Sequence, residues 1–311
     1  MIRSIIAKHS SNGTAPNLGP ATERDNWRGL KWMMLSVIAS SAMTIAARIA
    51  SEELDSRMVV LGRGALTLIT MLALLAVSTK LRGKLQFTDL RGHLIRGFLI
   101  AISTQMGFYT IATIPLATTT ILFFTAPIFA TILAIMVHGE KIGPRRISAI
   151  VGGFAGVLII LRPGFDALEL GLVTAIGSSL TFATALTMSR NLSNADGPIS
   201  TYFSSVVIMV IVSIPIAAPA MTIPSLNITW IAILTLVITS TTRGISDIEA
   251  YRHADAALLT PITYLRIVLI GLAAFFFFDE TPDTPTLLGA TVIITATLYI
   301  AKRERTLKNS K

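Results

Sequence analysis

Residues 117–137 read ATTTILFFTAPIFATILAIMV, an apolar stretch without a single charged side chain. A helix needs about 20 such residues to cross the hydrocarbon core of a bilayer. Comparable stretches follow one another between residues 30 and 301, separated by short linkers. This pattern predicts an all-α integral membrane protein with ten transmembrane helices. The predicted spans are 30–50, 58–78, 94–113, 116–137, 146–161, 169–189, 200–219, 228–249, 256–278 and 284–301.

The composition agrees with this class of protein. Of the 311 residues, 52% are hydrophobic and 14% are charged, whereas a soluble domain carries about 25% charged residues. The net charge of +9 would suit a nucleic-acid partner, but the basic residues lie in short loops and tails beside apolar stretches. We therefore expect the lipid bilayer as a partner and no nucleic acid. The absence of cysteine excludes disulfides and thiolate chemistry, and no cofactor or metal site is predicted.

The distribution of lysine and arginine predicts the orientation of the chain. With the N-terminus inside, twenty of the 26 Lys and Arg residues fall in the inner segments, and the outer loops hold only Arg57 and Arg162. The four that remain lie within spans: Arg48, Arg63, Arg243 and Arg266. Because basic residues favour the cytoplasmic side, we predict a bacterial-type inner (plasma) membrane protein with both termini in the cytoplasm.

The spacing of two glutamates indicates an internal repeat. Glu140 follows the fourth predicted span, and Glu280 follows the ninth, 140 residues later. At the same offset, Phe124 matches Tyr264. Two halves of five spans each must have opposite orientations because five is odd, as in the inverted repeats of many secondary transporters. The glutamates would then lie at opposite membrane faces, where we expect each to cap a helix or pair within a loop.

The predicted organisation has four parts. Residues 1–29 form a mostly disordered cytoplasmic tail, and residues 302–311 form a basic cytoplasmic tail. Residues 30–161 form the first five-helix repeat, and residues 169–301 form the second. In such an architecture the substrate site is expected between the halves, near the midplane of the membrane.

Several short passages resemble the drug/metabolite transporter superfamily, and within it the EamA-type transporters. The resemblance covers essentially the whole chain. The passages are TAP at 125–127, HGEKIGPRR at 138–146, GGFAGVLIILRPG at 152–164, AYRHAD at 250–255, TPITY at 260–264, FDETPD at 278–283 and LLGA at 287–290.

The resemblance implies ten helices in two inverted halves around a central cavity that opens alternately to each side. It also implies a secondary transporter for a small polar organic metabolite, such as riboflavin, an amino acid or a nucleotide-derived compound like S-adenosylmethionine. Two other classes stay open: a membrane-embedded enzyme and a non-transporting structural membrane protein. The chain contains no Walker A loop and no hydrolase or zinc-peptidase motif, so we do not expect an enzyme. A homodimer is left open.

Arg266 is the most informative candidate because it is the only charge in the predicted span 256–278. A mid-membrane arginine costs at least about 2.5–3.5 kcal/mol, so it should face a partner or a hydrated cavity. One interpretation is a clamp for a carboxylate, phosphate or enolate-like anion, because guanidinium binds planar anions through two parallel hydrogen bonds. The other is an internal ion pair with Asp247 or Glu249.

The other charged residues within the predicted spans have simpler predicted roles. Asp247 follows Arg243 by four residues, so the two should share a helix face and pair. Arg63 is a candidate for gating, although we favour a side chain that reaches the outer interface. Arg48, near the end of the first span, is expected to be an interface anchor.

Five further residues are candidates for the substrate site. Pro261 interrupts the ninth span, and Tyr264 follows it by about one turn. From the opposite half, Gln105, Tyr109 and Phe124 could line the same cavity. For each aromatic side chain the alternative is helix packing or contact with lipid.

Overall fold

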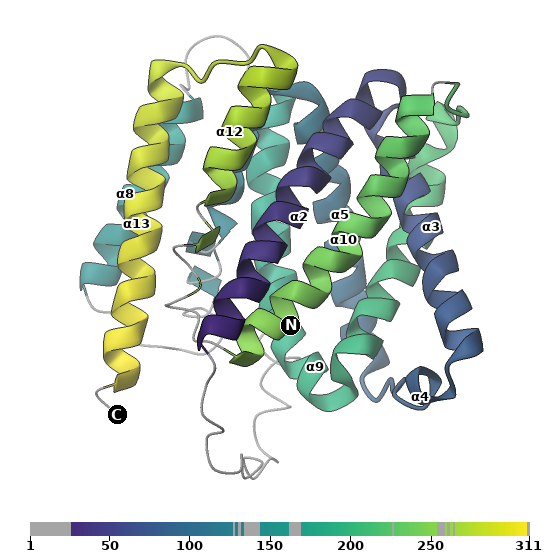
Figure 1. Ribbon diagram of the computed structural model, residues 1–311. Helices are drawn as coiled ribbons and strands as arrows, with labels where there is room; N and C mark the ends of the chain where they lie inside the picture. Colours follow the sequence, from purple (N-terminus) through teal and green to yellow (C-terminus); the bar gives the residue numbers. More distant parts are fainter. Residues whose placement is uncertain are drawn as a thin grey trace.

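The computed structural model describes residues 26–126, 128–129, 132–133, 144–161, 169–225, 227–253, 259, 262–263 and 265–309. Within these ranges every regular element is a helix (Figure 1). The elements are α2 (Asn26–Glu53), α3 (Ser56–Val77), α4 (Thr79–Arg82), α5 (Leu90–Thr113), α6 (Leu116–Phe123), α8 (Pro144–Leu161), α9 (Leu170–Ala217), the 3-10 turn η1 (Ala218–Ala220), α10 (Asn227–His253), α12 (Leu265–Phe278) and α13 (Thr284–Asn309).

The predicted membrane-protein class is confirmed by the length and composition of these helices. Among the described residues, six helical segments are long and apolar enough to cross a bilayer, and two shorter helices are also apolar. The six are Trp27–Glu53, Ser56–Val77, Leu90–Thr113, Leu170–Ser189, Ile199–Ala220 and Asn227–Asp247, and the shorter two are Leu265–Phe278 and Thr284–Thr295. The protein is therefore a multi-pass helical membrane protein.

The long element α9 contains two of these spans. Its helical hydrogen bonding runs across Gly197, whose φ of +81° is not helical. A residue with a side chain would be strained at this φ, so glycine allows the chain to turn between the spans. The predicted spans 169–189 and 200–219 correspond to the two halves of α9.

The outermost helices are longer than the predicted spans. Helix α2 begins at Asn26 rather than at residue 30, and α13 continues to Asn309, through most of the predicted tail at 302–311. Lysine, arginine, glutamate and leucine are good helix formers and extend α13 beyond its apolar part.

The fourth and ninth predicted spans are described only in part. Helix α6 ends at Phe123, where Thr125 N donates to Leu122 O, and α12 begins at Leu265. The interruptions were expected at Pro127 and Pro261, and both prolines lie outside the described residues.

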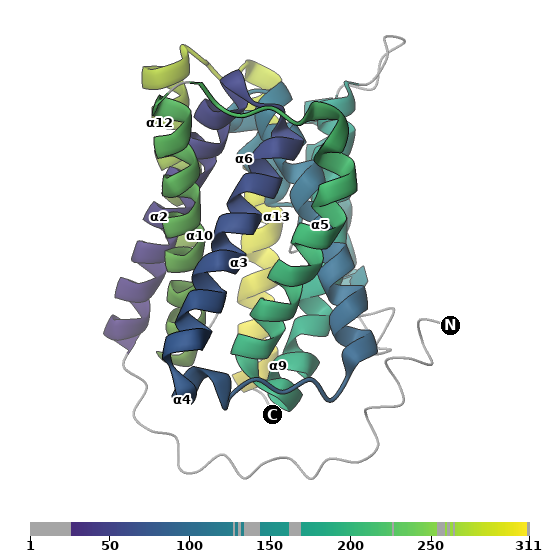
Figure 2. The same ribbon diagram turned by 90° about the vertical axis from the view of Figure 1, so that its right-hand side faces the viewer.

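The helices pack in pairs from different parts of the chain. Helix α2 crosses α10, α5 packs along α9, α8 lies against α13, and α6 contacts α12 (Figures 1 and 2). Small residues bring α8 and α13 close together, because a Cβ built on Gly289 would lie 2.7 Å from the carbonyl oxygen of Gly156. The largest buried cluster joins α2, α3, α5, α10 and α12 through residues such as Ala47, Val60 and Leu236.

The two ends of the bundle differ in charge. The connection from α12 to α13 and the end of α2 lie at the upper end in Figure 1, which carries Glu53, Asp55, Asp279 and Glu280. The start of α2, the helix α4 and the end of α13 lie at the lower end, which is rich in lysine and arginine. We call these two ends of the bundle the upper end and the lower end.

Candidate functional site

Arg266 lies on α12, about 18 Å along the helix axis from Phe278 at the upper end. Its Nη2 donates to Thr44 Oγ1 of α2 at 3.2 Å. Its Nε is buried without a hydrogen-bond partner among the described residues. The neighbouring Val268 and Leu272 are exposed on another face of α12. The guanidinium is therefore directed toward α2 and leaves at least one N–H unsatisfied.

Arg243 and Asp247 of α10 form the predicted local pair, with Nε and Oδ2 3.6 Å apart. Asp247 also accepts a hydrogen bond from Ser36 of α2, a contact across 211 positions of sequence that spacing alone could not predict. Asp247 attracts Arg266 electrostatically, but the two residues form no ion pair, and Arg266 bonds to Thr44 instead. The other predicted partner of Arg266, the side chain of Glu249, lies outside the described residues.

Arg63 of α3 points into the bundle. Its Nη2 lies 3.3 Å from the sulfur of Met209, and its guanidinium lies 5.3 Å from the centroid of the Phe108 ring. The expectation that it reaches the outer interface is therefore wrong. The physical reason is the helix period, because Val60 and Thr67 are buried on the same face of α3 and carry Arg63 inward.

These three arginines lie on helices that pack together, because α10 contacts both α2 and α3, and α12 contacts α2. Arg266 is directed toward α2 by its bond to Thr44, and Arg243 also acts electrostatically on Arg63 and Arg266. We call Arg63, Arg243 and Arg266 the arginine cluster. Asp247 is the carboxylate that interacts with it within the described part of the chain. The cluster can offer several N–H donors to an anion, which is the chemistry that the sequence predicted for Arg266 alone.

The other candidates do not join this cluster in the described structure. Gln105 Nε2 donates to Ser213 Oγ at 3.0 Å, a contact between α5 and α9. Phe124 packs in the cluster of α6, α8 and α13, and Tyr109 is half-buried on α5. Tyr264 and Pro261 lie outside the described residues.

Arg48 is not the interface anchor that its position in the sequence suggested. Its Nη1 donates to the carbonyl oxygens of Ile111 at 2.7 Å and Ile114 at 3.3 Å, and its Nη2 lies 3.1 Å from Glu280 Oε1. The side chain satisfies carbonyls at the end of α5, which would otherwise be unpaired at a helix C-terminus. Arg48 therefore crosslinks α2, α5 and the connection from α12 to α13.

Glu280 has the capping role that the sequence predicted. Its Oε2 accepts a hydrogen bond from the backbone N–H of Leu116 at 2.6 Å. Leu116 is the first residue of α6, where backbone N–H groups have no partner within the helix. A carboxylate at this position also interacts favourably with the helix dipole.

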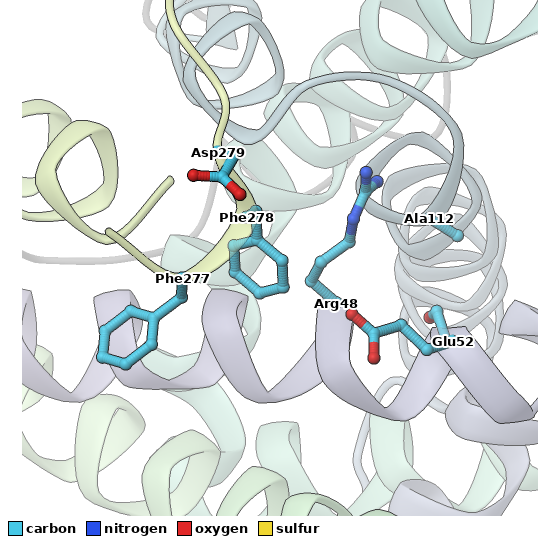
Figure 3. Close-up of a pocket in the computed structure, with 7 residues that line it drawn as sticks. Arg48, Glu52, Ala112, Phe277, Phe278 and Asp279 are labelled. Atoms are coloured by element: carbon cyan, nitrogen blue, oxygen red, sulfur yellow. The ribbon is translucent and has the colours of Figure 1, made fainter. Parts of the chain in front are cut away.

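A cavity of about 460 Å³ adjoins this pair at the upper end (Figure 3). It lies close to the ends of α2, α5 and α12 and therefore far from Arg266 along α12. Figure 3 shows Arg48 between Phe278 and Glu52. The lining residues are Arg48, Ser51, Glu52, Ala112, Phe277, Phe278 and Asp279.

A buried polar network joins α5 to α9 at the lower end. His93 Nε2 lies 2.9 Å from Asp196 Oδ2, and His93 Nδ1 lies 2.8 Å from Ser204 Oγ. Burial disfavours the Asp196 carboxylate, but hydrogen bonds from Thr88 and His93 outweigh this and hold its pKa at about 2. With His93 only 1% exposed, the network cannot reach a substrate, so we assign it to helix packing.

The arrangement of apolar helices around inward-facing arginines is typical of a membrane carrier. The model of the EamA-like transporter family matches the chain twice, at residues 27–162 and 169–302. The chain therefore belongs to the EamA-like transporter family, within the drug/metabolite transporter superfamily.

Relatives that are named as transporters match nearly the whole chain. The S-adenosylmethionine uptake transporter of Rickettsia bellii is 29% identical over 91% of this chain and 96% of its own length. The riboflavin transporter of Vibrio cholerae is 26% identical over 89% and 94%, and the pseudopaline exporter of Pseudomonas aeruginosa is 25% identical over 88% and 96%. A solved crystal structure matches with a TM-score of 0.53 and 16% identity over 91% of this chain and 96% of the other, which supports the fold alone.

Proposed function

We propose that this protein is a secondary transporter that moves a small polar organic metabolite across the membrane by alternating access. The observation that carries the proposal is the arginine cluster. Three guanidinium groups lie among the helices of a membrane protein, where unpaired charge is costly and marks substrate pathways. In the proposed site, α3, α10 and α12 supply the charges and α2 supplies polar contacts through Ser36 and Thr44.

The proposal includes ten membrane helices in two inverted repeats, at 30–161 and 169–301. The two family matches, at 27–162 and 169–302, support this division. The helix pairing supports it as well. If the two halves are exchanged, α2 corresponds to the first half of α9, and α10 corresponds to α5. The observed α2–α10 pair therefore matches the observed pair of α5 and the first half of α9. The pairs α6–α12 and α8–α13 each map onto themselves.

We further propose that the lower end faces the cytoplasm, with both termini on that side of a bacterial-type inner membrane. The support is the concentration of lysine and arginine at the lower end and of carboxylates at the upper end. The relatives named above are bacterial, which agrees with this location.

The names of the relatives suggest the size and type of substrate. S-adenosylmethionine, riboflavin and pseudopaline are all small polar metabolites, and the relatives include both uptake transporters and an exporter. We therefore propose transport of a metabolite, without enzymatic conversion and without a resident cofactor.

Counterflow in proteoliposomes tests this function. Vesicles are loaded with one unlabelled compound and diluted into a trace of the same labelled compound, using S-adenosylmethionine, riboflavin, glutamate, succinate and glycerol 3-phosphate in turn. A carrier gives a transient accumulation of label that requires the unlabelled compound inside. A channel gives equilibration without accumulation, and an enzyme or structural protein gives neither. Absence of counterflow for every compound would contradict the proposal.

A further inference from the structure

The arginine cluster has more positive charge than the described residues around it neutralise. Arg63, Arg243 and Arg266 contribute three formal positive charges, and Asp247 contributes one negative charge. Asp247 is partly occupied by the hydrogen bond from Ser36. The surplus within the described structure is therefore two positive charges, among helices that cross the membrane.

The hydrogen-bond inventory leads to the same conclusion. Each guanidinium carries five N–H donors and accepts none. The described acceptors are Thr44 Oγ1 for Arg266, the weakly accepting sulfur of Met209 for Arg63, and Asp247 for Arg243. The Nε groups of Arg63 and Arg266 are both buried and unpartnered. A buried donor without a partner is destabilising, and more so when the group is charged.

A ligand with two negative charges and several acceptor oxygens can neutralise the surplus positive charge and also pair with the unsatisfied N–H donors. We infer that the arginine cluster binds a dianionic group, either a dicarboxylate or a phosphate monoester, as the substrate group that this transporter recognises. The inference rests on the proposed function and narrows it to one substrate class. Planar guanidinium groups suit both chemistries because they pair with carboxylate and phosphate oxygens in matching geometry.

This charge balance separates the chain from the substrates in the names of two of its relatives, S-adenosylmethionine and riboflavin. S-adenosylmethionine carries a sulfonium and an ammonium against one carboxylate, so it adds positive charge to the cluster. Riboflavin is uncharged at neutral pH and compensates none of it. A dianion compensates the formal surplus of two.

Asp247 competes with the proposed ligand for Arg243, because its Oδ2 lies 3.6 Å from Arg243 Nε. Replacement by asparagine keeps an oxygen that can accept from Ser36 but removes the competing charge. Asp247→Asn should therefore tighten the binding of a dianion, whereas a cationic substrate would need this carboxylate and would bind more weakly without it.

Thermal unfolding of the purified full-length protein in detergent tests binding. The probes are inorganic phosphate, succinate and glycerol 3-phosphate, with sodium chloride at matched ionic strength as the reference. We expect at least one dianion to raise the melting temperature above the chloride reference. Arg266→Gln and Arg243→Gln should each weaken the apparent affinity about tenfold or more, since a charge-assisted hydrogen bond contributes about 1.5–3 kcal/mol. Arg57→Gln is the matched control, because Arg57 lies on the same helix as Arg63 but is exposed and paired with Asp55.

The variant Asp247→Asn keeps the test decisive if an arginine variant does not fold. A lower concentration of dianion for half-maximal stabilisation supports the inference. An unchanged or higher concentration overturns it, as does stabilisation by dianions that survives equally in Arg266→Gln, Arg243→Gln and Arg57→Gln.

Counterflow then separates the inference from the proposed function. Accumulation of labelled succinate or glycerol 3-phosphate, with none for S-adenosylmethionine or riboflavin, supports both. Accumulation of S-adenosylmethionine or riboflavin without either dianion overturns the inference and leaves the transporter proposal intact. No accumulation of any probe, including glutamate, overturns both.

Discussion

Arg48 of α2 and Glu280, two residues beyond the end of α12, form an ion pair in which Nη2 and Oε1 are 3.1 Å apart. The same glutamate accepts from the first N–H of α6, and the same arginine donates to two carbonyls at the end of α5. The side chains are 23% and 13% exposed, so water screens the pair only partly. This one pair joins four segments of the chain at the upper end of the bundle.

Removal of the Glu280 charge should destabilise the protein. Glu280→Gln leaves Arg48 partly buried without its counter-charge and weakens the cap of α6, at a cost of about 1–3 kcal/mol. The melting temperature in detergent, followed by tryptophan fluorescence, should fall by several degrees. Asp55→Asn is the control, because its pair with Arg57 is largely exposed and should matter little. An equal effect of both substitutions would contradict the assigned role of Glu280.

The orientation of the chain gives a second prediction. A reporter fused after Lys311 should read cytoplasmic, and a reporter inserted near Asn227, at the start of α10, should read external. The reason is the difference in basic residues between the lower and upper ends. Fusions of alkaline phosphatase and of a fluorescent protein at each site measure this directly, and both sites on one side would contradict the ten-helix arrangement.

The third prediction concerns acid stability. Hydrogen bonds hold the pKa of Asp196 at about 2, below its ordinary 3.8. The stabilisation is therefore complete above pH 3.8 and is lost as the pH falls toward 2, and it amounts to roughly 2 kcal/mol.

Asp196→Asn tests this directly. The melting temperature of the variant should lie below that of the natural protein by a constant amount from pH 5 to 7, which spans ordinary working conditions. Below about pH 4 the difference should shrink, because the natural carboxyl group becomes protonated. A difference that stays constant down to the lowest pH at which both proteins fold would contradict the role of the Asp196 charge.

Helix positions could be predicted from the sequence because bilayer thickness sets a length that apolar stretches must match. The spans predicted at 58–78 and 94–113 agree with α3 and α5 within a few residues. The ends of α2 and α13 were less accessible to this reasoning. Both helices continue into polar segments, where helix propensity and not hydrophobicity decides the boundary.

Side-chain directions could not be predicted in the same way. The position of Arg48 and Arg63 within their predicted spans gives the approximate membrane depth of their Cα atoms. It does not give the positions of the guanidinium groups, which lie several ångströms away on flexible side chains. The partners of both arginines come from distant segments, namely Glu280 and Met209. The local Arg243–Asp247 pair was predictable because it depends only on the helix period.

Arg266 provides the most direct test of the substrate site. Arg266→Lys retains the positive charge but loses the planar fork, so binding of the counterflow-active compound should weaken while the protein still inserts and folds. Arg266→Ala loses the charge as well and should weaken binding further, each step by about tenfold. Half-saturation of counterflow measures the effect at matched protein abundance, with Arg57→Lys on α3 as a control at an exposed arginine. Because Arg266 donates to Thr44, Thr44→Val should have a smaller effect than Arg266→Ala. Normal half-saturation in Arg266→Ala would restrict this arginine to a structural role.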